Sequence, residues 1–496
     1  MAGAGMRKFN YRLVARLTGM LLIYLAVGMV VPIGVSLYAA DGAQFSLTVS
    51  ALIVLMVGLL LRNIFGRHAE YDIRERESIW MTVIIWLMVP LCGTLPYLFV
   101  GGMGSHLFVD ALFESFSGFT TTGSSVIVHP EELPASLLVY RSMTQWIGGL
   151  GLLLFVVATL RKLGVAAGSL YSAEFSGTQQ RKLHPRLARS VSRMWRIYIL
   201  VTLAMIVLLL TQGASLVDSI ALAFSTVSTG GFVTHSAGVA TLGPGVMSVL
   251  VVFMVLSGVN VALLYRLFTF HWRRPVPLWR DEELRVYLLI FIVSVVVCSV
   301  SFLSEGNDLQ HSISYSVFHI ASTMSTSGYY LPSLPRWSLL VSVLTFALIV
   351  VGASAGSTGG GIKLRRIIIL AKYIGNYFTR MMHSEAVFRV KVNGEVVEDG
   401  YIHKVFAFVF LYMAFIVAGA FVLTLCGTSI PEAVCMAAAN VSNLGPSPLI
   451  NNLGGSLDYS LLPVMGKLTL IVLMLAGRLE IFALVAVFSP SYWRRN

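Results

Sequence analysis

The sequence predicts an all-α polytopic membrane protein, with four repeated helix–half-helix–helix units around one axis and an extra N-terminal helix hairpin. Three observations support this. The 496 residues are 56% hydrophobic and only 12% charged, with a mean hydropathy of +0.81, whereas soluble domains carry about 25% charged residues. Four short segments align with one another without gaps. Alternate connections between the apolar stretches are rich in lysine and arginine, and the others have neither.

The apolar stretches set the number of spans, because about 20 apolar residues cross roughly 30 Å of hydrocarbon. Ten stretches approach this length, at about 17–38, 47–61, 79–100, 137–160, 195–211, 246–270, 286–303, 337–356, 403–426 and 464–488. The first two form the predicted hairpin of residues 1–70. The remaining eight pair into repeats at 71–162, 190–272, 282–380 and 400–496.

Each repeat contains one segment too short to cross, at about 110–123, 218–231, 315–328 and 432–445. The segments end in glycines that stand 108, 97 and 117 residues apart, namely Gly123, Gly231, Gly328 and Gly445. We expect each to be a half-helix that enters the membrane partway and returns as an extended segment. Four such units around one axis predict a central pore, which makes the half-helices pore helices.

The residues before each glycine are suited to binding a dehydrated cation. Backbone carbonyls can replace the water around an ion without adding net charge, and glycine permits the positive φ that aims them. The candidate filter residues are Thr121, Thr122, Gly123, Thr229, Gly230, Gly231, Thr326, Ser327, Gly328, Asn443, Leu444 and Gly445. A single copy would be explained better by close helix packing through small residues. Four aligned copies favour the filter.

Acidic residues begin three of the half-helices, at Asp110, Asp218 and Glu432. They could form an outer ring that attracts cations, or they could cap the helices, since a carboxylate satisfies free N–H groups at a helix N-terminus. Capping is the favoured interpretation, and Tyr315 at the third position argues against a symmetric ring.

The third repeat is interrupted by a glycine-rich sequence that ends at Lys363. A phosphate-binding loop is excluded because Ile362 separates Gly361 from the lysine. Since each glycine costs a helix about 1 kcal/mol, we expect a break in the helix and a flexible gate below the third filter segment. The candidate gating residues in this break are Gly352, Gly356, Ser357, Thr358, Gly359, Gly360, Gly361 and Lys363.

Charged residues also lie within the spans. Arg478 stands in the last span near Glu480, where a charge is costly and usually faces a polar interior. It could be a structural pair with Glu480 or with backbone carbonyls, or a positive charge that controls the pore. Lys467, Arg141 and Arg336 lie nearer span ends, where snorkelling of the side chain to the interface suffices as an explanation.

The distribution of lysine and arginine indicates orientation. Segments 39–46, 101–136, 212–246, 304–335 and 427–461 have neither residue, and the alternate connections are rich in both. By the positive-inside rule both termini are cytoplasmic and all four half-helices enter from the outer side. The net charge of +12 therefore indicates contact with membrane lipid rather than with nucleic acid. Asn393-Gly394 between alternating apolar residues predicts a small cytoplasmic β-hairpin.

These motifs resemble the Trk/Ktr/HKT superfamily of potassium transporters, and most closely its TrkH subfamily. The resemblance covers essentially the whole chain, and its most specific sequences are RSMTQWIGGLG at 141–151, NVSNLGP, GSTGGGIK and AGRLE around Arg478. It implies that the four glycine segments coordinate K⁺ and that the Gly352–Lys363 loop and Arg478 hold the closed state. It also implies a homodimer in the bacterial inner membrane, with TrkA-like regulatory subunits that bind nucleotides in the cytoplasm. Gly123 in the first filter segment favours potassium over sodium in this superfamily.

The predicted function is therefore channel-like K⁺ uptake, with no organic cofactor bound by this chain and no enzymatic activity. The alternative in mechanism is a symporter that couples K⁺ or Na⁺ to H⁺ or Na⁺. A proton relay would require a run of carboxylates and histidines across the spans, which the sequence lacks. The alternative of another class, a membrane enzyme, would require a cluster of catalytic residues at one membrane face, and none is found.

Overall fold

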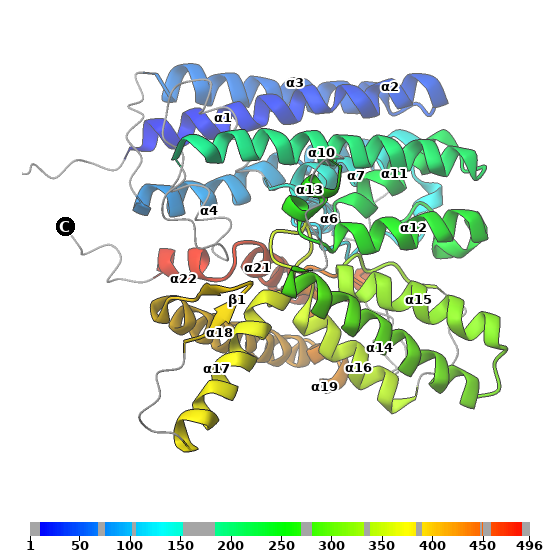
Figure 1. Cartoon of the computed structure of the whole chain (residues 1–496). Helices are drawn as coiled ribbons and strands as arrows, with labels where there is room; N and C mark the ends of the chain where they lie inside the picture. Colours follow the sequence, from blue (N-terminus) through cyan, green and yellow to red (C-terminus); the bar gives the residue numbers. More distant parts are fainter. Residues whose placement is uncertain are drawn as a thin grey trace, which may run out of the picture.

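The computed structural model describes residues 10–67, 75–101, 106–151, 184–268, 280–331, 338–382, 389–446, 449 and 458–488. Within these ranges nearly all regular structure is α-helical, and six helices are long and apolar enough to cross a membrane. The chain is a multi-pass membrane protein built from bundled helices (Figure 1).

The N-terminal hairpin lies along one edge of the molecule (Figure 1). It consists of α1 (Tyr11–Gly28), α2 (Val30–Ala39) and α3 (Gln44–Leu60), and a π-helical turn (Leu61–Phe65) extends α3. Gly19 and Gly58 let α1 and α3 approach closely, since a Cβ at Gly19 would lie 2.6 Å from the Gly58 carbonyl oxygen. The hairpin packs on the next part of the chain through contacts of α1 with α4 and of α2 with α7.

Four units follow, each with a long helix, a half-helix and a second helix. Unit 1 has α4 (Glu75–Cys92), α5 (Leu95–Val100), α6 (Leu107–Phe119) and α7 (Ala135–Gly149). Unit 2 has α10 (His184–Thr211), α11 (Leu216–Val227), α12 (Pro244–Ser257) and α13 (Val261–Phe268). Unit 3 has α14 (Glu282–Ser304), α15 (Leu309–Ser325), α16 (Leu339–Val351) and α17 (Leu364–Met382). Unit 4 has α18 (Asp399–Leu425), α19 (Ile430–Val441), α21 (Val464–Arg478) and α22 (Phe482–Phe488). Short 3₁₀ turns lie at Pro130–Glu132, Gly238–Leu242 and Tyr459–Leu461.

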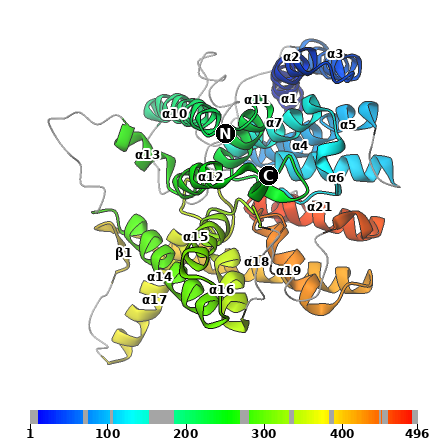
Figure 2. The same cartoon turned by 90° about the vertical axis from the view of Figure 1, so that its right-hand side faces the viewer.

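The units close into a ring, because the second helix of each packs on the half-helix of the next. The contacting pairs are α7 with α11, α12 with α15, α16 with α19, and α21 with α6. Figure 2 shows the four groups of helices around a common centre. The predicted all-α polytopic membrane fold is confirmed, and the described residues contain four helix–half-helix–helix units.

The half-helices are buried along most of their length, and large side chains fill the space around them, including Phe113, Phe119, Tyr140, Phe318 and Tyr412. Short polar residues begin two of them. Ser215 accepts a hydrogen bond from the Asp218 N–H at the start of α11 (3.0 Å), and Asp308 accepts one from the Gln310 N–H at the start of α15 (3.1 Å). Helix α15 therefore begins six residues before Tyr315, the position that the alignment gave as its start.

Two of the second helices differ from the prediction, which had continuous spans at 246–270 and 464–488, whereas the break within 337–356 was expected. Helix α12 stops at Ser257 because the Gly258 carbonyl accepts a bond from Ser354 N–H of unit 3 (3.1 Å). Asn260 then starts α13 by accepting from Ala262 N–H (2.8 Å). Helix α16 gives way to the Gly352–Lys363 loop, and α21 is separated from α22 by a break at Leu479–Ile481. The second half of the span predicted at 137–160 lies outside the described residues, as does Arg336.

The predicted hairpin is present, with β1 (Lys391–Val392) antiparallel to β2 (Glu395–Val396). Asn393 and Gly394 both have positive φ, +53° and +82°, as a two-residue hairpin turn requires. The turn rests on the start of α14, where Glu282 N–H donates to Asn393 Oδ1 (2.7 Å).

Candidate functional site

All four half-helices end in the same backbone turn. In unit 1 the N–H of Thr122 donates to the Ser117 carbonyl (2.9 Å) and the N–H of Thr121 to the Gly118 carbonyl (2.9 Å). This pair of bonds is a Schellman motif, and units 2 to 4 repeat it at the equivalent positions. The motif needs a left-handed residue at its centre, which is usually glycine. Here that place is taken by Thr121, Thr229, Thr326 and Asn443, with φ of +57°, +59°, +60° and +51°.

Two residues later comes the predicted glycine, again with positive φ in every unit. The values are +83° at Gly123, +79° at Gly231, +73° at Gly328 and +81° at Gly445. A side chain at these positions would be strained by the backbone conformation alone. These four residues are called the glycine ring below.

The loops meet one another in cyclic order. A Cβ built on Gly123 would overlap the Gly230 carbonyl oxygen, and one on Gly231 would overlap the Ser327 carbonyl oxygen. The same relation continues from Gly328 to the Leu444 oxygen and from Gly445 back to the Thr122 oxygen. Each glycine thus lies against the carbonyl that precedes the next glycine. The structure therefore brings the four segments together in one closed ring of backbone oxygens.

Side chains join the loops across unit boundaries. Ser124 Oγ donates to Asn440 Oδ1 (2.9 Å), and Asn443 Nδ2 donates to Thr122 Oγ1 (3.0 Å), which link units 1 and 4. Thr226 and Tyr329 share a hydroxyl–hydroxyl bond (2.9 Å) between units 2 and 3. Leu444 is buried, and its carbonyl takes the same place as those of its counterparts. Its bulk therefore does not prevent the fourth loop from following the backbone pattern.

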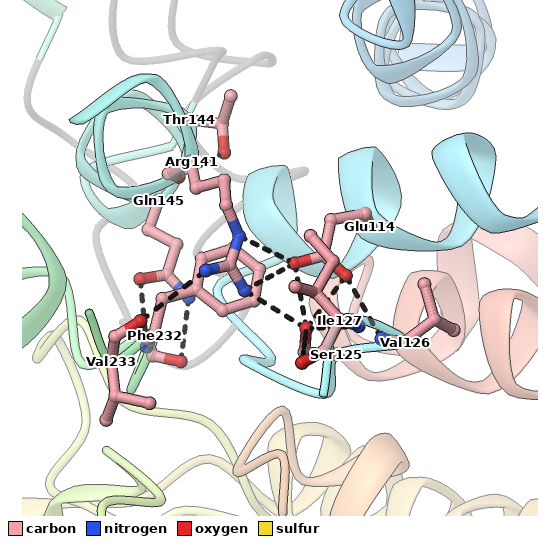
Figure 3. Close-up of polar contacts among 10 residues, drawn as sticks. Glu114, Ser125, Val126, Ile127, Arg141, Thr144, Gln145, Phe232 and Val233 are labelled. Carbon is pink, nitrogen blue, oxygen red and sulfur yellow. Dashed lines mark hydrogen bonds and ion pairs between the residues drawn. The ribbon is translucent and has the colours of Figure 1, made fainter. Parts of the chain in front are cut away.

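A buried ion pair lies behind the first two loops (Figure 3). Arg141 on α7 donates from Nε and Nη2 to Glu114 Oε1 on α6, at 2.8 and 2.6 Å. Glu114 also accepts bonds from Ser125 Oγ (3.1 Å) and from the Val126 N–H (3.2 Å), just after the first loop. The expectation that Arg141 snorkels is wrong. Its guanidinium is buried, because the neighbouring half-helix supplies a carboxylate inside the protein.

A second buried ion pair joins units 1 and 4. Lys467 Nζ on α21 lies 2.6 Å from Asp110 Oδ1 on α6, and both residues are fully buried. The snorkelling expected for Lys467 is therefore also wrong, since α21 packs on α6 rather than facing the interface. Asp110 also accepts a bond from the His106 N–H (3.2 Å), so it keeps part of the predicted capping role. A residue buried in this pair does not line an outer ring.

The Gly352–Lys363 loop lies against the half-helix ends of units 2, 3 and 4. The Gly360 N–H donates to Thr326 Oγ1 (2.9 Å), and a Cβ on Gly360 would overlap the Ser442 carbonyl oxygen. Thr358 Oγ1 donates to the carbonyl of Val227, the last residue of α11 (3.2 Å). Positive φ at Gly352 (+70°), Gly356 (+76°), Gly361 (+78°) and Lys363 (+75°) shapes the turns. Ser357, Gly359 and the rest of the candidate residues fall within this one loop, as the sequence predicted.

Arg478 bridges this loop and the turn at the end of α6. Its Nη1 donates to Thr121 Oγ1 (3.3 Å) and to the Thr358 carbonyl (3.4 Å). Its Nη2 donates to the carbonyls of Gly148 and Gly149, the latter at 2.9 Å. Of the two structural partners considered from the sequence, backbone carbonyls are thus observed.

Glu480, in the break of unit 4, forms ion pairs with two residues of unit 3. Its Oε2 lies 2.5 Å from Arg366 Nη2, and its Oε1 lies 3.9 Å from Lys363 Nζ. This cluster ties the end of the Gly352–Lys363 loop to the break between α21 and α22.

Three buried polar residues at the site were given no role from the sequence: Glu114, Gln145 and Glu283. Gln145 Nε2 donates to the Gly230 carbonyl (2.8 Å), and Glu283 Oε1 accepts from the Ala355 N–H of the loop (2.6 Å). A carboxylate inside an apolar half-helix is a signal that could have identified Glu114. Within the described residues no group of three or more His, Cys, Asp or Glu is arranged to hold a metal ion. Backbone carbonyls and hydroxyls are therefore the oxygens that the site offers.

Comparisons with known proteins agree with this architecture. The model of the TrkH family, described as "Cation transport protein", matches residues 46–495. The Trk system potassium uptake protein TrkH of Salmonella typhimurium is 32% identical over 490 residues, covering 98% of this chain and 100% of the relative. The potassium uptake protein TrkG of Escherichia coli is 31% identical over 499 residues, covering 99% and 100%. The crystal structure of the potassium transporter TrkH from Vibrio parahaemolyticus matches with a TM-score of 0.84 and 30% identity, covering 98% of this chain and 100% of that one. The chain belongs to the TrkH family of cation transport proteins.

Proposed function

We propose that this chain is a potassium uptake protein that conducts K⁺ through the centre of the glycine ring. The observation that carries the proposal is the cyclic contact of each ring glycine with the carbonyl that precedes the next one. The names of the relatives, which are potassium uptake proteins, support the same substrate. The residues proposed to coordinate the ion are the twelve predicted from the sequence, three from each loop.

The physical basis is the replacement of water around the ion. In a low-dielectric slab a cation needs oxygen ligands, and neutral carbonyls provide them without binding so tightly that the ion cannot leave. Irregular backbone at this depth is tolerated where it is buried in protein or lines water. The Schellman turns and positive φ values hold the carbonyls at fixed positions, which favours one ion size and coordination over another.

We further propose that the Gly352–Lys363 loop closes the path on the far side of the ring from the half-helices' entry, and that Arg478 stabilises this closed arrangement. The loop bonds to half-helix ends of units 2 and 3, and Arg478 connects it to Thr121 of unit 1. A homodimer with TrkA-like nucleotide-binding subunits in the bacterial inner membrane, with both termini cytoplasmic, remains a prediction. It depends on the resemblance and on the lysine and arginine distribution.

Uptake of ⁸⁶Rb⁺ into liposomes that contain the purified protein tests the transport proposal. We expect an outward K⁺ gradient alone, with equal Na⁺ and pH on both sides, to drive Rb⁺ accumulation. Protein-free liposomes are the control. Accumulation that requires an imposed Na⁺ or proton gradient would establish the symporter instead.

Deletion of Gly359, Gly360 and Gly361 tests the gate. It also provides a variant that should conduct Rb⁺ even if the wild-type pore stays closed in liposomes. The shortened loop can no longer reach both Thr326 and the α19 end, so resting Rb⁺ flux should rise. If neither the wild type nor this variant carries Rb⁺, the transport proposal is refuted. If both carry the same flux, the loop is not the gate.

A further inference from the structure

The second loop of the glycine ring is held from behind by a side chain of unit 1. Gln145 is fully buried on α7, and its Nε2 donates to the Gly230 carbonyl oxygen at 2.8 Å. Its Oε1 accepts a bond from the Phe232 N–H at 3.4 Å. One side-chain amide therefore contacts the backbone on both sides of Gly231 (Figure 3).

The residue type at position 230 is explained by this contact. The equivalent positions in the other loops carry side chains: Thr122, Ser327 and Leu444. Gly230 has no positive φ that would require glycine, unlike Gly231 beside it. A Cβ on Gly230 would instead overlap the Gln145 amide carbon. The glycine is thus needed for space, and the space is occupied by Gln145.

Neighbouring side chains hold Gln145 and the segment that it contacts in fixed positions. Arg141 lies one helical turn earlier on the same face of α7, where its guanidinium stacks over the Phe232 ring at 4.3 Å. Its Nη1 donates to the Val233 carbonyl at 3.4 Å, while Glu114 holds the rest of the guanidinium. The ion pair and the amide together fix the chain from Gly230 to Val233 relative to α6 and α7, as Figure 3 shows.

The Gly230 carbonyl is also the oxygen that lies against Gly123 in the ring. An N–H donated to it fixes its direction and takes up one of its two lone pairs. The preference of a carbonyl site for K⁺ over Na⁺ depends on the number, field strength and freedom of its dipoles. A neutral donor on one of these carbonyls changes the field strength and the freedom of that quarter of the ring.

We propose that Gln145 is a specificity-determining positioning residue, which acts on the permeating ion through the Gly230 carbonyl. The Glu114–Arg141 pair keeps the amide in place. The inference rests on the proposed function, because it assigns Gln145 to the selectivity of the same ring.

The test separates the hydrogen bond from the packing. Gln145→Met fills similar space without the amide, and Gln212→Met, at an exposed glutamine beside Gly245, is the matched control. We expect Gln145→Met to lower the Rb⁺ over Na⁺ flux ratio in liposomes by roughly 3- to 10-fold, the size expected for one neutral hydrogen bond. The control should keep the wild-type ratio. A wild-type ratio in Gln145→Met would overturn the proposal.

A double variant distinguishes positioning from mere space-filling. Gly230→Ala should be poorly folded because its Cβ overlaps the amide, and Gln145→Ala/Gly230→Ala should recover the melting temperature because the overlap is gone. If Gln145 acts through the carbonyl, this double variant regains stability but not the flux ratio. Recovery of both would show that Gln145 only fills space, and the proposal would fail.

A binding measurement separates this inference from the transport proposal. An ion that binds the folded protein raises its melting temperature, so K⁺ should stabilise detergent-solubilised wild type more than Na⁺ does. Loss of this difference in Gln145→Met, with retention in Gln212→Met, supports the inference even if the liposomes show no Rb⁺ flux. An unchanged difference in Gln145→Met refutes it, whatever the flux.

Discussion

Substitution of Gly123 by serine is the most direct test of the glycine ring, since two separate effects are predicted from the structure. The φ of +83° strains any side chain by about 1–2 kcal/mol. The new Cβ would also overlap the Gly230 carbonyl oxygen, which Gln145 holds in place. Overpacking of a buried site typically costs a further ~1–3 kcal/mol. The overlap can be relieved only by moving a carbonyl of the ring.

Gly101, at the end of α5, provides the matched control. Its φ of +79° is almost the same, but a Cβ there would have no heavy atom within 4 Å. Gly101→Ser should therefore carry the backbone strain without the overlap. The two variants differ in the one feature that the proposal depends on.

The assay is the flux of Rb⁺ and of Na⁺ into liposomes, alongside the melting temperature in detergent. We expect Gly123→Ser to lower the Rb⁺ over Na⁺ ratio roughly tenfold, which corresponds to about 1.4 kcal/mol of ion discrimination. Gly101→Ser should lose some stability and keep the wild-type ratio. Equal ratios in wild type and Gly123→Ser, or equal losses of selectivity in both variants, would refute the reasoning.

Three other predictions concern the surroundings of the ring. Thr326→Gly relieves left-handed strain but removes the acceptor for the Gly360 N–H, so resting Rb⁺ flux should rise. Thr326→Ser keeps a hydroxyl there and should keep the pore closed. Similar flux in both variants would exclude this bond from gating. Lys467→Met leaves the Asp110 carboxylate buried and unpaired, which should lower the free energy of unfolding by about 3–5 kcal/mol. The double variant Lys467→Met/Asp110→Asn should restore most of this loss. Thermal unfolding of the single and double variants measures both, and equal losses would contradict the prediction. Arg478→Gln should raise open probability in single-channel recordings with little change in ion preference, and a pure change in preference would assign the residue to selectivity instead.

The repeated backbone could be predicted from the sequence because it depends on local signals. Each half-helix carries its own hydroxyl-rich end and its own glycine, and four copies give the register directly. The threonines in left-handed conformation could not be predicted this way, since β-branched residues rarely adopt it. The side chains of two of them give a reason: Thr121 accepts from Arg478 and Thr326 from the Gly360 N–H. In these two loops the strained residue supplies a hydroxyl that bonds to Arg478 or to the Gly352–Lys363 loop.

The buried polar pairs were missed because they depend on which helix faces meet. Asp110 and Lys467 are 357 residues apart, and each alone is compatible with a span end near water. Only the packing of α21 on α6 brings them together. Each span taken by itself is compatible with snorkelling, and only the closure of the ring buries these side chains.

The ends of the second helices also contribute contacts between neighbouring units of the ring. In three units a glycine at or beyond the end of the second helix lies against the serine at the end of the next half-helix: Gly149 against Ser228, Gly258 against Ser325, and Gly360 against Ser442. A Cβ at Gly149 or Gly360 would overlap that serine, and one at Gly258 would overlap the Tyr287 hydroxyl, so glycine is required in these places.

The contact between units 4 and 1 is different, because within the described residues no glycine of the second helix lies against the end of the next half-helix there. There the side chain of Arg478 reaches Thr121, and it bonds at the same time to the Gly352–Lys363 loop. Three junctions are thus fixed by close packing, which has no alternative arrangement at low cost. The Arg478 contacts on the loop side of this junction can be broken without leaving a cavity, while the Lys467–Asp110 pair and the packing of α21 on α6 still join units 4 and 1. We therefore expect movement of the proposed gate to begin at the Arg478 contacts with the loop, while the packing at all four junctions keeps the ring intact.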